Sequence, residues 1–212
     1  MNRRFLGSMA LGLAAVLATA SPLMAHAADE APDALIKRLS TDVLDSLKAD
    51  KSIHAGDVSR IISLVDSKIM PNVNFQRMTA AAVGPGWRQA TPEQQKRLQD
   101  EFKTLLVRTY SGALTQVTDQ SITVKPLRAA ADDAEVVVRT EIRGRGDPIQ
   151  LDYRLEKTAG QGAGWKIYNL NVLGVWLVET YRSQFAKEIN ANGIDGLIAT
   201  LTERNKANAK KG

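Results

Sequence analysis

The chain has 212 residues, with 28 lysines and arginines against 23 acidic residues, and it contains no cysteine. The absence of cysteine excludes disulfides and thiol chemistry, and the small excess of positive charge gives no reason to expect a nucleic acid as a partner.

The first 27 residues have the three parts of a secretory signal peptide. A basic "MNRR" precedes the apolar run "FLGSMALGLAAVLATA", and "AHA" at Ala25–Ala27 is a small-x-small cleavage site. An uncleaved membrane anchor is the alternative, but the apolar run is short for a membrane span and Ser21-Pro22 interrupts it. We therefore expect a single soluble domain, residues 28–212, in a bacterial periplasm, because no second apolar run is long enough to cross a bilayer.

Four segments of the first half have the apolar periodicity of helices. The first three are residues 32–47, 57–70 and 74–84. The fourth, residues 91–117, is the strongest because Thr91 can cap it, Pro92 takes its first position, and Gln94 completes a capping box.

A period of two then predicts an antiparallel sheet with one covered and one wet face. Strands are expected over residues 134–143 and 149–157, joined by a "GRGDP" turn, with further strands at 121–127 and 164–173. The apolar phase slips between Ile167 and Leu170 in the last strand, which predicts a bulge. The expected covered face carries Val136, Val138, Leu151, Tyr153 and Leu155, and the expected wet face carries Arg139, Glu141, Asp152 and Arg154.

The chain ends in two predicted helices, residues 175–191 and 195–205, separated by Asn192-Gly193. A flexible basic tail is expected at about residues 206–212. Helices, then an antiparallel sheet, then helices indicate an α+β domain, with a curved sheet covered by helices.

The sequence offers little for catalysis. His54 is the one histidine after the predicted signal peptide, there is no G-x-S-x-G motif, and no cluster of side chains suits a metal. The G-x-G of the "GRGDP" turn joins two strands, so it does not form a phosphate cradle. One enzyme alternative remains, in which an acid such as Asp152 or Glu141 is buried in an apolar cavity and its pKa is raised.

Bulky apolar side chains on facing elements are the more prominent feature. They either close on one another as a dry core or stand apart and hold a hydrophobic ligand. If they hold a ligand, the candidate contacts are Phe75, Met78, Phe102, Leu105, Leu106, Tyr110, Val136, Val138, Leu151, Tyr153, Leu155, Val175, Trp176, Leu177, Val178 and Tyr181.

Three segments resemble a known family. "GPGWRQATPEQQKRLQDEFKTLLVRTYSGAL" (84–114), "WKIYNLNVLGVWLVETYRSQF" (165–185) and "GIDGLIATL" (193–201) are similar to signatures of the toluene-tolerance auxiliary family, the periplasmic phospholipid-binding component of the Mla pathway. That pathway maintains lipid asymmetry in the Gram-negative outer membrane. The chain departs from the family at Trp176, where a small residue, often serine, is usual.

The resemblance implies a fold like nuclear transport factor 2, with a deep cavity for acyl chains and the headgroup near solvent. It implies a carrier that shuttles phospholipid between the outer and inner membranes, with no catalytic residues, no metal and no cofactor. The partners implied are an outer-membrane lipoprotein–porin complex and an inner-membrane ABC transporter with its substrate-binding hexamer. The chain itself is expected to be a monomer.

Overall fold

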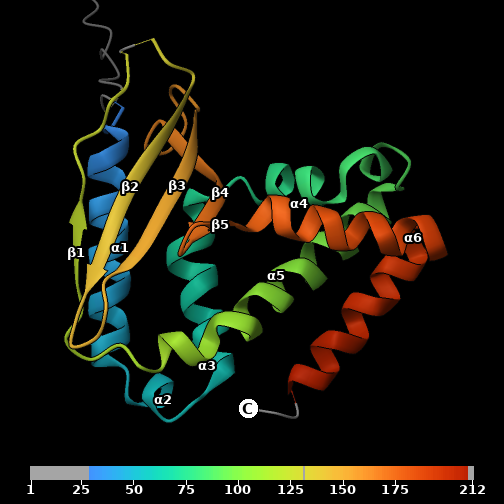
Figure 1. Ribbon diagram of the computed structural model, residues 1–212, viewed down its shortest axis with the longest axis horizontal. Helices are drawn as coiled ribbons and strands as arrows, with labels where there is room; N and C mark the ends of the chain where they lie inside the picture. The colour runs from blue at the N-terminus through green and yellow to red at the C-terminus, as the bar shows by residue number, and fades with distance from the viewer. Residues whose placement is uncertain (1–28, 131, 210–212) are drawn as a thin grey trace, which may run out of the picture.

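A computed structural model describes residues 29–130 and 132–209 (Figure 1). The predicted signal peptide lies outside the described residues. In chain order the elements are α1 (Pro32–Ala49), α2 (Lys51–His54), α3 (Val58–Leu64), a π-helical turn η1 (Val65–Ile69), the 3-10 turn η2 (Met70–Asn72), α4 (Phe75–Val83), the 3-10 turn η3 (Gly84–Arg88), α5 (Pro92–Leu114), β1 (Ser121–Val124), β2 (Glu135–Arg143), β3 (Ile149–Lys157), β4 (Trp165–Val172), β5 (Val175–Trp176) and α6 (Leu177–Ala209).

The helix limits follow from local chemistry. The capping box of α5 is confirmed, since Thr91 Oγ1 accepts from the amide of Gln94 while Gln94 Oε1 accepts from the amide of Thr91. The helix predicted over 57–70 loses α-geometry after Leu64 and becomes a π turn and then a 3-10 turn. Pro71 lies in that last turn, where its missing amide and its ring prevent a regular helix from continuing.

The last helix bends where a break was predicted. Gly193 has φ 71° and ψ −171° inside α6, a conformation that glycine adopts without steric cost. The second half of α6 then turns back beneath the first half (Figure 1). Residues 206–209, expected to start a flexible tail, instead continue this helix, and the rest of that predicted tail lies outside the described residues.

The α+β prediction is confirmed by a five-stranded antiparallel sheet in the order β1-β2-β3-β4-β5. The predicted bulge is confirmed as well. Arg154 of β3 pairs with Asn169 of β4 and Leu155 pairs with Ile167, so Tyr168 has no counterpart on β3. The bulge lets both parts of β4 present apolar side chains to the same face, through Ile167 before it and Leu170 after it.

Buried apolar side chains form three clusters. The sheet core joins α1 to the sheet, the helical core lies among α4, α5 and α6, and the lower core lies among α1, α2, α3 and the end of α5. Their largest members are Leu35, Ile36, Leu155 and Trp165 in the sheet core, Phe75, Phe102, Tyr181 and Phe185 in the helical core, and Leu47, Ile53 and Ile61 in the lower core.

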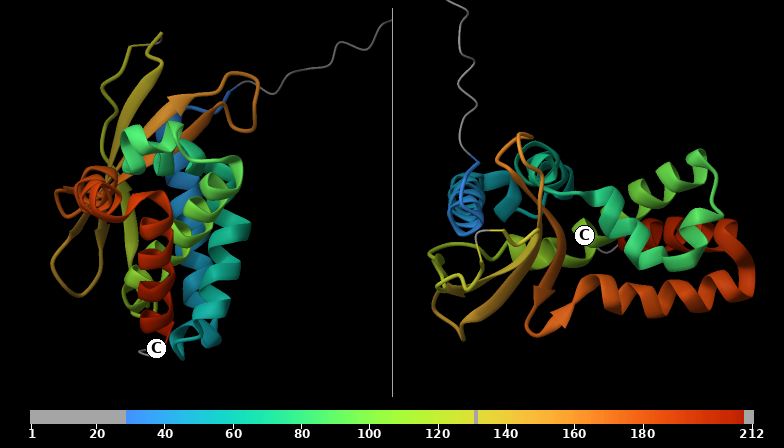
Figure 2. Two further views of the ribbon diagram at one scale, coloured as in Figure 1. Left: turned by 90° about the vertical axis from the view of Figure 1, so that its right-hand side faces the viewer. Right: turned by 90° about the horizontal axis from the view of Figure 1, so that it is seen from above.

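Aromatic contacts centre on one ring of the helical core. The centroid of Phe102 lies 5.7 Å from that of Phe75, 5.0 Å from that of Tyr181 and 5.2 Å from that of Phe185. The two last pairs are edge-to-face, an arrangement that the ring quadrupoles favour. Figure 2, seen from above, shows α1 at one end of the molecule and α6 at the other, so the sheet core and the helical core are distinct masses.

Candidate functional site

The side chains predicted to contact a ligand are divided between two cores. Phe75, Met78, Phe102, Leu105, Leu177, Val178 and Tyr181 are buried in the helical core, and the half-buried Leu106 and Tyr110 pack against it. Val136, Val138 and Leu155 are buried in the sheet core, and the half-buried Tyr153 packs against it. The fully buried members close on their neighbours, as the dry-core alternative requires.

Half-buried apolar side chains lie where the cores adjoin. Leu170 and Val172 of β4 pack against the helical core. Their cross-strand partners on β3 are Tyr153 and Leu151, so these four side chains share one face of the sheet. With the two α5 residues they form what we call the junction set: Leu106, Tyr110, Leu151, Tyr153, Leu170 and Val172.

Other half-buried residues connect the cores around this set. Met70 packs against both the helical and the lower core, Val73 against both the sheet and the helical core, and Val43 against both the sheet and the lower core. The three clusters therefore meet through side chains that keep some exposure. Such side chains can separate at a smaller cost than fully buried ones, because less contact area is lost.

The junction set is uncharged. Burial raises the pKa of the Tyr153 and Tyr110 phenols, so both rings stay neutral at physiological pH. The other four members are aliphatic. The arrangement offers apolar contact to a ligand and no acid–base group. Four of the six were among the predicted ligand contacts. Leu170 and Val172 were not, although the alternation that resumes after the bulge places them on the same face.

Two of the residues predicted to contact a ligand, Val175 and Trp176, lie outside the junction set and outside the buried cores. Val175 is half exposed at the sheet end, with 50% of its surface accessible. Trp176 pairs with Asn171, on the face opposite the junction set, and its ring stacks under the guanidinium of Arg154. The indole of Trp176, a candidate ligand contact, therefore lies on the outer face of the sheet.

The exposure predicted for Asp152 is wrong. Its side chain lies on the outer face, as the alternation predicts, but it is only 5% exposed. Because β3 is the central strand, Arg139 on β2 and Asn171 on β4 flank Asp152 and shield it. Its Oδ2 accepts from Gln150 Nε2 at 2.9 Å, whereas Oδ1 is buried with no partner among the described residues.

Glu141, the second carboxylate of the enzyme alternative, does not have the raised pKa that this alternative needs. Hydrogen bonds from Arg143 and Lys125 lower the pKa of Glu141, so it stays ionised. His54 contacts two backbone carbonyls, Thr115 O at 3.3 Å from Nδ1 and Lys48 O at 3.4 Å from Nε2. Within residues 29–130 and 132–209, no three His, Cys, Asp or Glu side chains gather as a metal site would require.

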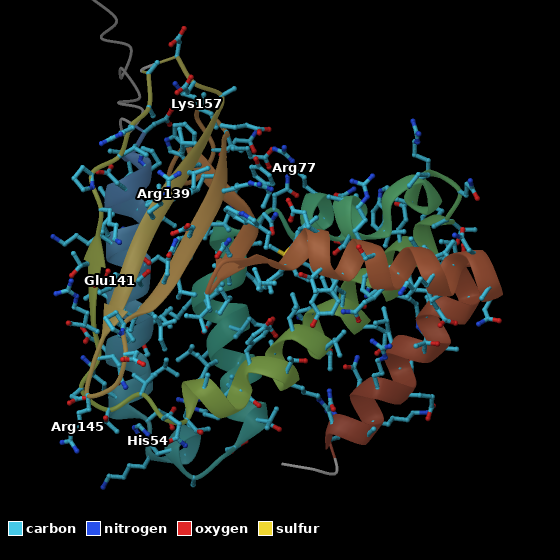
Figure 3. All side chains as sticks on the ribbon, viewed as in Figure 1. His54, Arg77, Arg139, Glu141, Arg145 and Lys157 are labelled. Atoms are coloured by element: carbon cyan, nitrogen blue, oxygen red, sulfur yellow. The ribbon has the colours of Figure 1, made fainter. Side chains whose placement is uncertain are left out.

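A network of polar contacts ties α4 to the sheet. Arg77, labelled in Figure 3, donates to Glu135 and to Glu156, and its guanidinium lies 3.7 Å from the centroid of the Tyr168 ring. Asn74, which caps α4, donates to the same Glu156 carboxylate at 2.6 Å. The bulge makes the contact between Arg77 and Tyr168 possible, because Tyr168 is the unpaired residue that the bulge turns outward.

A surface pocket of about 780 Å³ lies between α1, α2 and α3. It is lined by polar residues that include Asp50, Lys51, Arg60 and Lys68. None of its lining residues is among the side chains predicted to contact lipid. Among the helices of the described part of the chain, none combines the length and apolarity of a membrane span.

Comparison with known proteins gives a consistent result. The family model described as MlaC protein matches residues 37–203. The toluene tolerance protein ttg2D of Pseudomonas putida is 31% identical over 183 residues, which are 85% of this chain and 82% of that protein. The intermembrane phospholipid transport system binding protein MlaC of Haemophilus influenzae is 24% identical over 178 residues, which are 83% of each.

A solved structure is similar over most of the chain. It is a phospholipid-binding protein from Ralstonia solanacearum in complex with a phospholipid. It is 47% identical to this chain, its TM-score is 0.80, and the match covers 84% of this chain and 98% of that one.

Proposed function

The chain belongs to the MlaC protein family, and we propose that it binds phospholipid and carries it through the periplasm between the two membranes of a Gram-negative envelope. The phospholipid bound by the 47% identical Ralstonia protein supports the ligand. The name of the Haemophilus relative, an intermembrane phospholipid transport system binding protein, supports the process.

The acyl chains bind at the junction set in this proposal. Its basis is six uncharged, half-buried side chains: four on one face of β3 and β4, and two on α5 that pack against the helical core. Acyl chains that enter here part the sheet from the helical core and replace contacts between those two layers. The fully buried members of each core keep the two layers intact while they separate.

The free energy of tail transfer limits how such a carrier works. Burial of acyl chains from water is worth about 0.8 kcal/mol per CH₂, so two tails with roughly 30 such groups gain on the order of 24 kcal/mol. A bilayer shields the same tails equally well. The carrier must therefore hold lipid about as strongly as a bilayer does, and loss of the lipid to water is too slow to be useful. Loading and release accordingly need a partner.

The proposed partners are those that the family resemblance implies: an outer-membrane lipoprotein–porin complex, and an inner-membrane ABC transporter with its substrate-binding hexamer. We propose that the mature chain, residues 28–212, is a monomer that takes no metal or cofactor. It acts as a carrier rather than an enzyme, and the ionised Glu141 and the acid-free junction set support that reading.

One experiment tests the carrier function directly. The chain is expressed with its leader and purified from the periplasm, and the protein is extracted with organic solvent for mass spectrometry. We expect co-purified phospholipid and an intact protein mass that corresponds to cleavage after Ala27. A protein that carries no phospholipid, and takes up none from vesicles, would contradict the proposal and return the enzyme alternative at Asp152.

A further inference from the structure

Three large apolar side chains stand out in the described part of the chain because they are exposed to solvent. Ile149 is 40% exposed, Leu173 is 64% exposed and Val175 is 50% exposed. All three lie at one end of the sheet. The amide of Leu173 donates to the carbonyl of Gln150 at 3.0 Å, and Val175 pairs with Val172 across the turn. We call Ile149, Leu173 and Val175 the apolar tip.

The centre of the apolar tip has an unfavourable backbone. Leu173 has φ 53° and is the one non-glycine with a positive φ among the described residues. That region suits glycine, asparagine and aspartate, whereas a leucine there is strained. The turn is fixed by Gly174, whose amide donates to Asn171 Oδ1 at 2.8 Å. A strained residue with an exposed apolar side chain indicates a role outside the stability of the chain itself.

The apolar tip is continuous with the proposed lipid site. Val172 precedes Leu173 and pairs with Val175 on one side and with Leu151 on the other. Val172 and Leu151 are half-buried members of the junction set. Strand pairing therefore joins the exposed turn directly to two residues of the place where the acyl chains are proposed to bind.

We propose that the apolar tip docks on a partner protein and forms the rim over which phospholipid passes, an inference that rests on the proposed carrier function. The partner surface is apolar, and it presents an extended segment beside β5. Contact between two apolar rims keeps the tails out of water during transfer, which removes the largest barrier to loading and release.

The surroundings of the apolar tip favour a protein over a bilayer as the occupant. β5 is an edge strand of the sheet, and a protein segment can pair with an edge strand whereas hydrocarbon cannot. Two arginines near the turn of the neighbouring hairpin are already paired, Arg143 with Glu141 and Arg145 with Asp119. Glu141 and Arg145 are labelled in Figure 3. These ion pairs offset the positive charge that would draw the tip to an anionic membrane.

Two substitutions at Leu173 separate docking from folding. Leu173→Asn removes the apolar side chain and places at φ 53° a residue that tolerates it, so its melting temperature should equal or exceed that of the wild type. Leu173→Met keeps the apolar side chain and the strain. Leu173 is outside the junction set, so both variants should purify with as much phospholipid as the wild type.

The assay measures discharge of labelled phospholipid from loaded protein. One acceptor is protein-free vesicles of phosphatidylethanolamine and phosphatidylglycerol. The other is the same vesicles reconstituted with membrane proteins extracted from the source bacterium. We expect the wild type and Leu173→Met to discharge faster into the second acceptor. Leu173→Asn should lose this acceleration, by about threefold or more, with an unchanged rate into protein-free vesicles.

Each other result overturns the inference. An equal acceleration in Leu173→Asn shows that the apolar tip does not dock. An absence of acceleration in the wild type shows that no membrane protein acts as a docking partner for the apolar tip. Slower discharge of Leu173→Asn into protein-free vesicles shows that the tip meets the bilayer. Failure of the carrier function is distinct from all of these, because it appears as an absence of phospholipid in the wild type and both variants.

Discussion

The guanidinium of Arg154 lies over the indole of Trp176, with its Cζ 4.0 Å from the ring centroid. Arg154 also donates to Glu179, and Asn169 donates to the other oxygen of that carboxylate at 2.8 Å. Oδ1 of Asn169 in turn accepts from the amide of Val178 at 3.2 Å. These contacts tie β3 and β4 to β5 and the first turn of α6, on the outer face of the sheet.

The first prediction concerns the position of Trp176. In a protein that carries Trp87→Phe and Trp165→Phe, Trp176 is the one tryptophan left. Because its ring lies on the face opposite the junction set, bound lipids brominated along the tails should leave its emission unchanged. Strong quenching by these lipids would place the ring in the acyl site and contradict the structure.

The second prediction measures the coupling between Arg154 and Trp176. A double-mutant cycle of Arg154→Met and Trp176→Leu, followed by urea denaturation, should give a coupling free energy of about 0.5–1 kcal/mol, as expected of a partly exposed cation–π pair. Arg154→Met combined with Trp87→Phe serves as the control, and its effects should add. A coupling near zero in the first cycle would show that the stacking contributes nothing measurable.

The third prediction is a loss of stability in acid. Hydrogen bonds from Arg77 and Tyr168 lower the pKa of Glu135 in the folded protein. Partial burial alone would raise the pKa of Glu179, but hydrogen bonds from Asn169 and Arg154 outweigh it and the pKa is lowered. The stabilisation from both groups is therefore fully present above the unfolded pKa of about 4.3 and is lost as the pH falls through the lower folded values.

The measurement is the free energy of unfolding from neutral pH to about pH 3. Glu135→Gln should be less stable than the wild type at neutral pH, and the difference should shrink as the pH falls. Glu203→Gln is the matched control, because Glu203 makes an exposed ion pair with Lys206 within one helix. An equally steep decline in Glu135→Gln and the wild type would contradict the assignment to Glu135.

The fourth prediction separates the lipid site from the dry core on the same sheet face. Leu151 is half-buried in the junction set, whereas Val138 is 1% exposed in the sheet core. Leu151→Trp should reduce bound phospholipid at little cost in stability. Val138→Trp should overpack the sheet core and lower the free energy of unfolding by about 1–3 kcal/mol or more. A large loss of stability in lipid-free Leu151→Trp would mean that this part of the face is dry core as well.

Local patterns in the sequence predicted the elements well. The capping box of α5, the break at Gly193 and the bulge around Tyr168 all depend on residues a few positions apart, so their signals are contained in short segments. The face of each strand residue follows in the same way from the period of two. The prediction ran past Leu64 because apolar periodicity alone does not show how far upstream Pro71 disturbs the helix.

The exposed fraction of a side chain and the contacts it makes, in contrast, depend on the residues that pack beside it and over it. Asp152 takes the face that its position in β3 predicts, but its burial follows from flanking strands that are distant in the sequence. Trp176 is a bulky apolar residue at a strand-to-helix corner, and only the pairing of β5 with β4 turns its ring toward Arg154.

The sequence by itself predicted most of the secondary structure, the faces of the strands and, through its resemblance to two long signatures and a closing helix, the family. Only the tertiary structure showed which of the sixteen predicted apolar contacts are buried in the cores, which are half-buried in the junction set, and which lie at the apolar tip or on the outer face. The reason is physical. Periodicity fixes the direction of a side chain relative to its own backbone, whereas burial is a property of the space between elements, which register and packing fill.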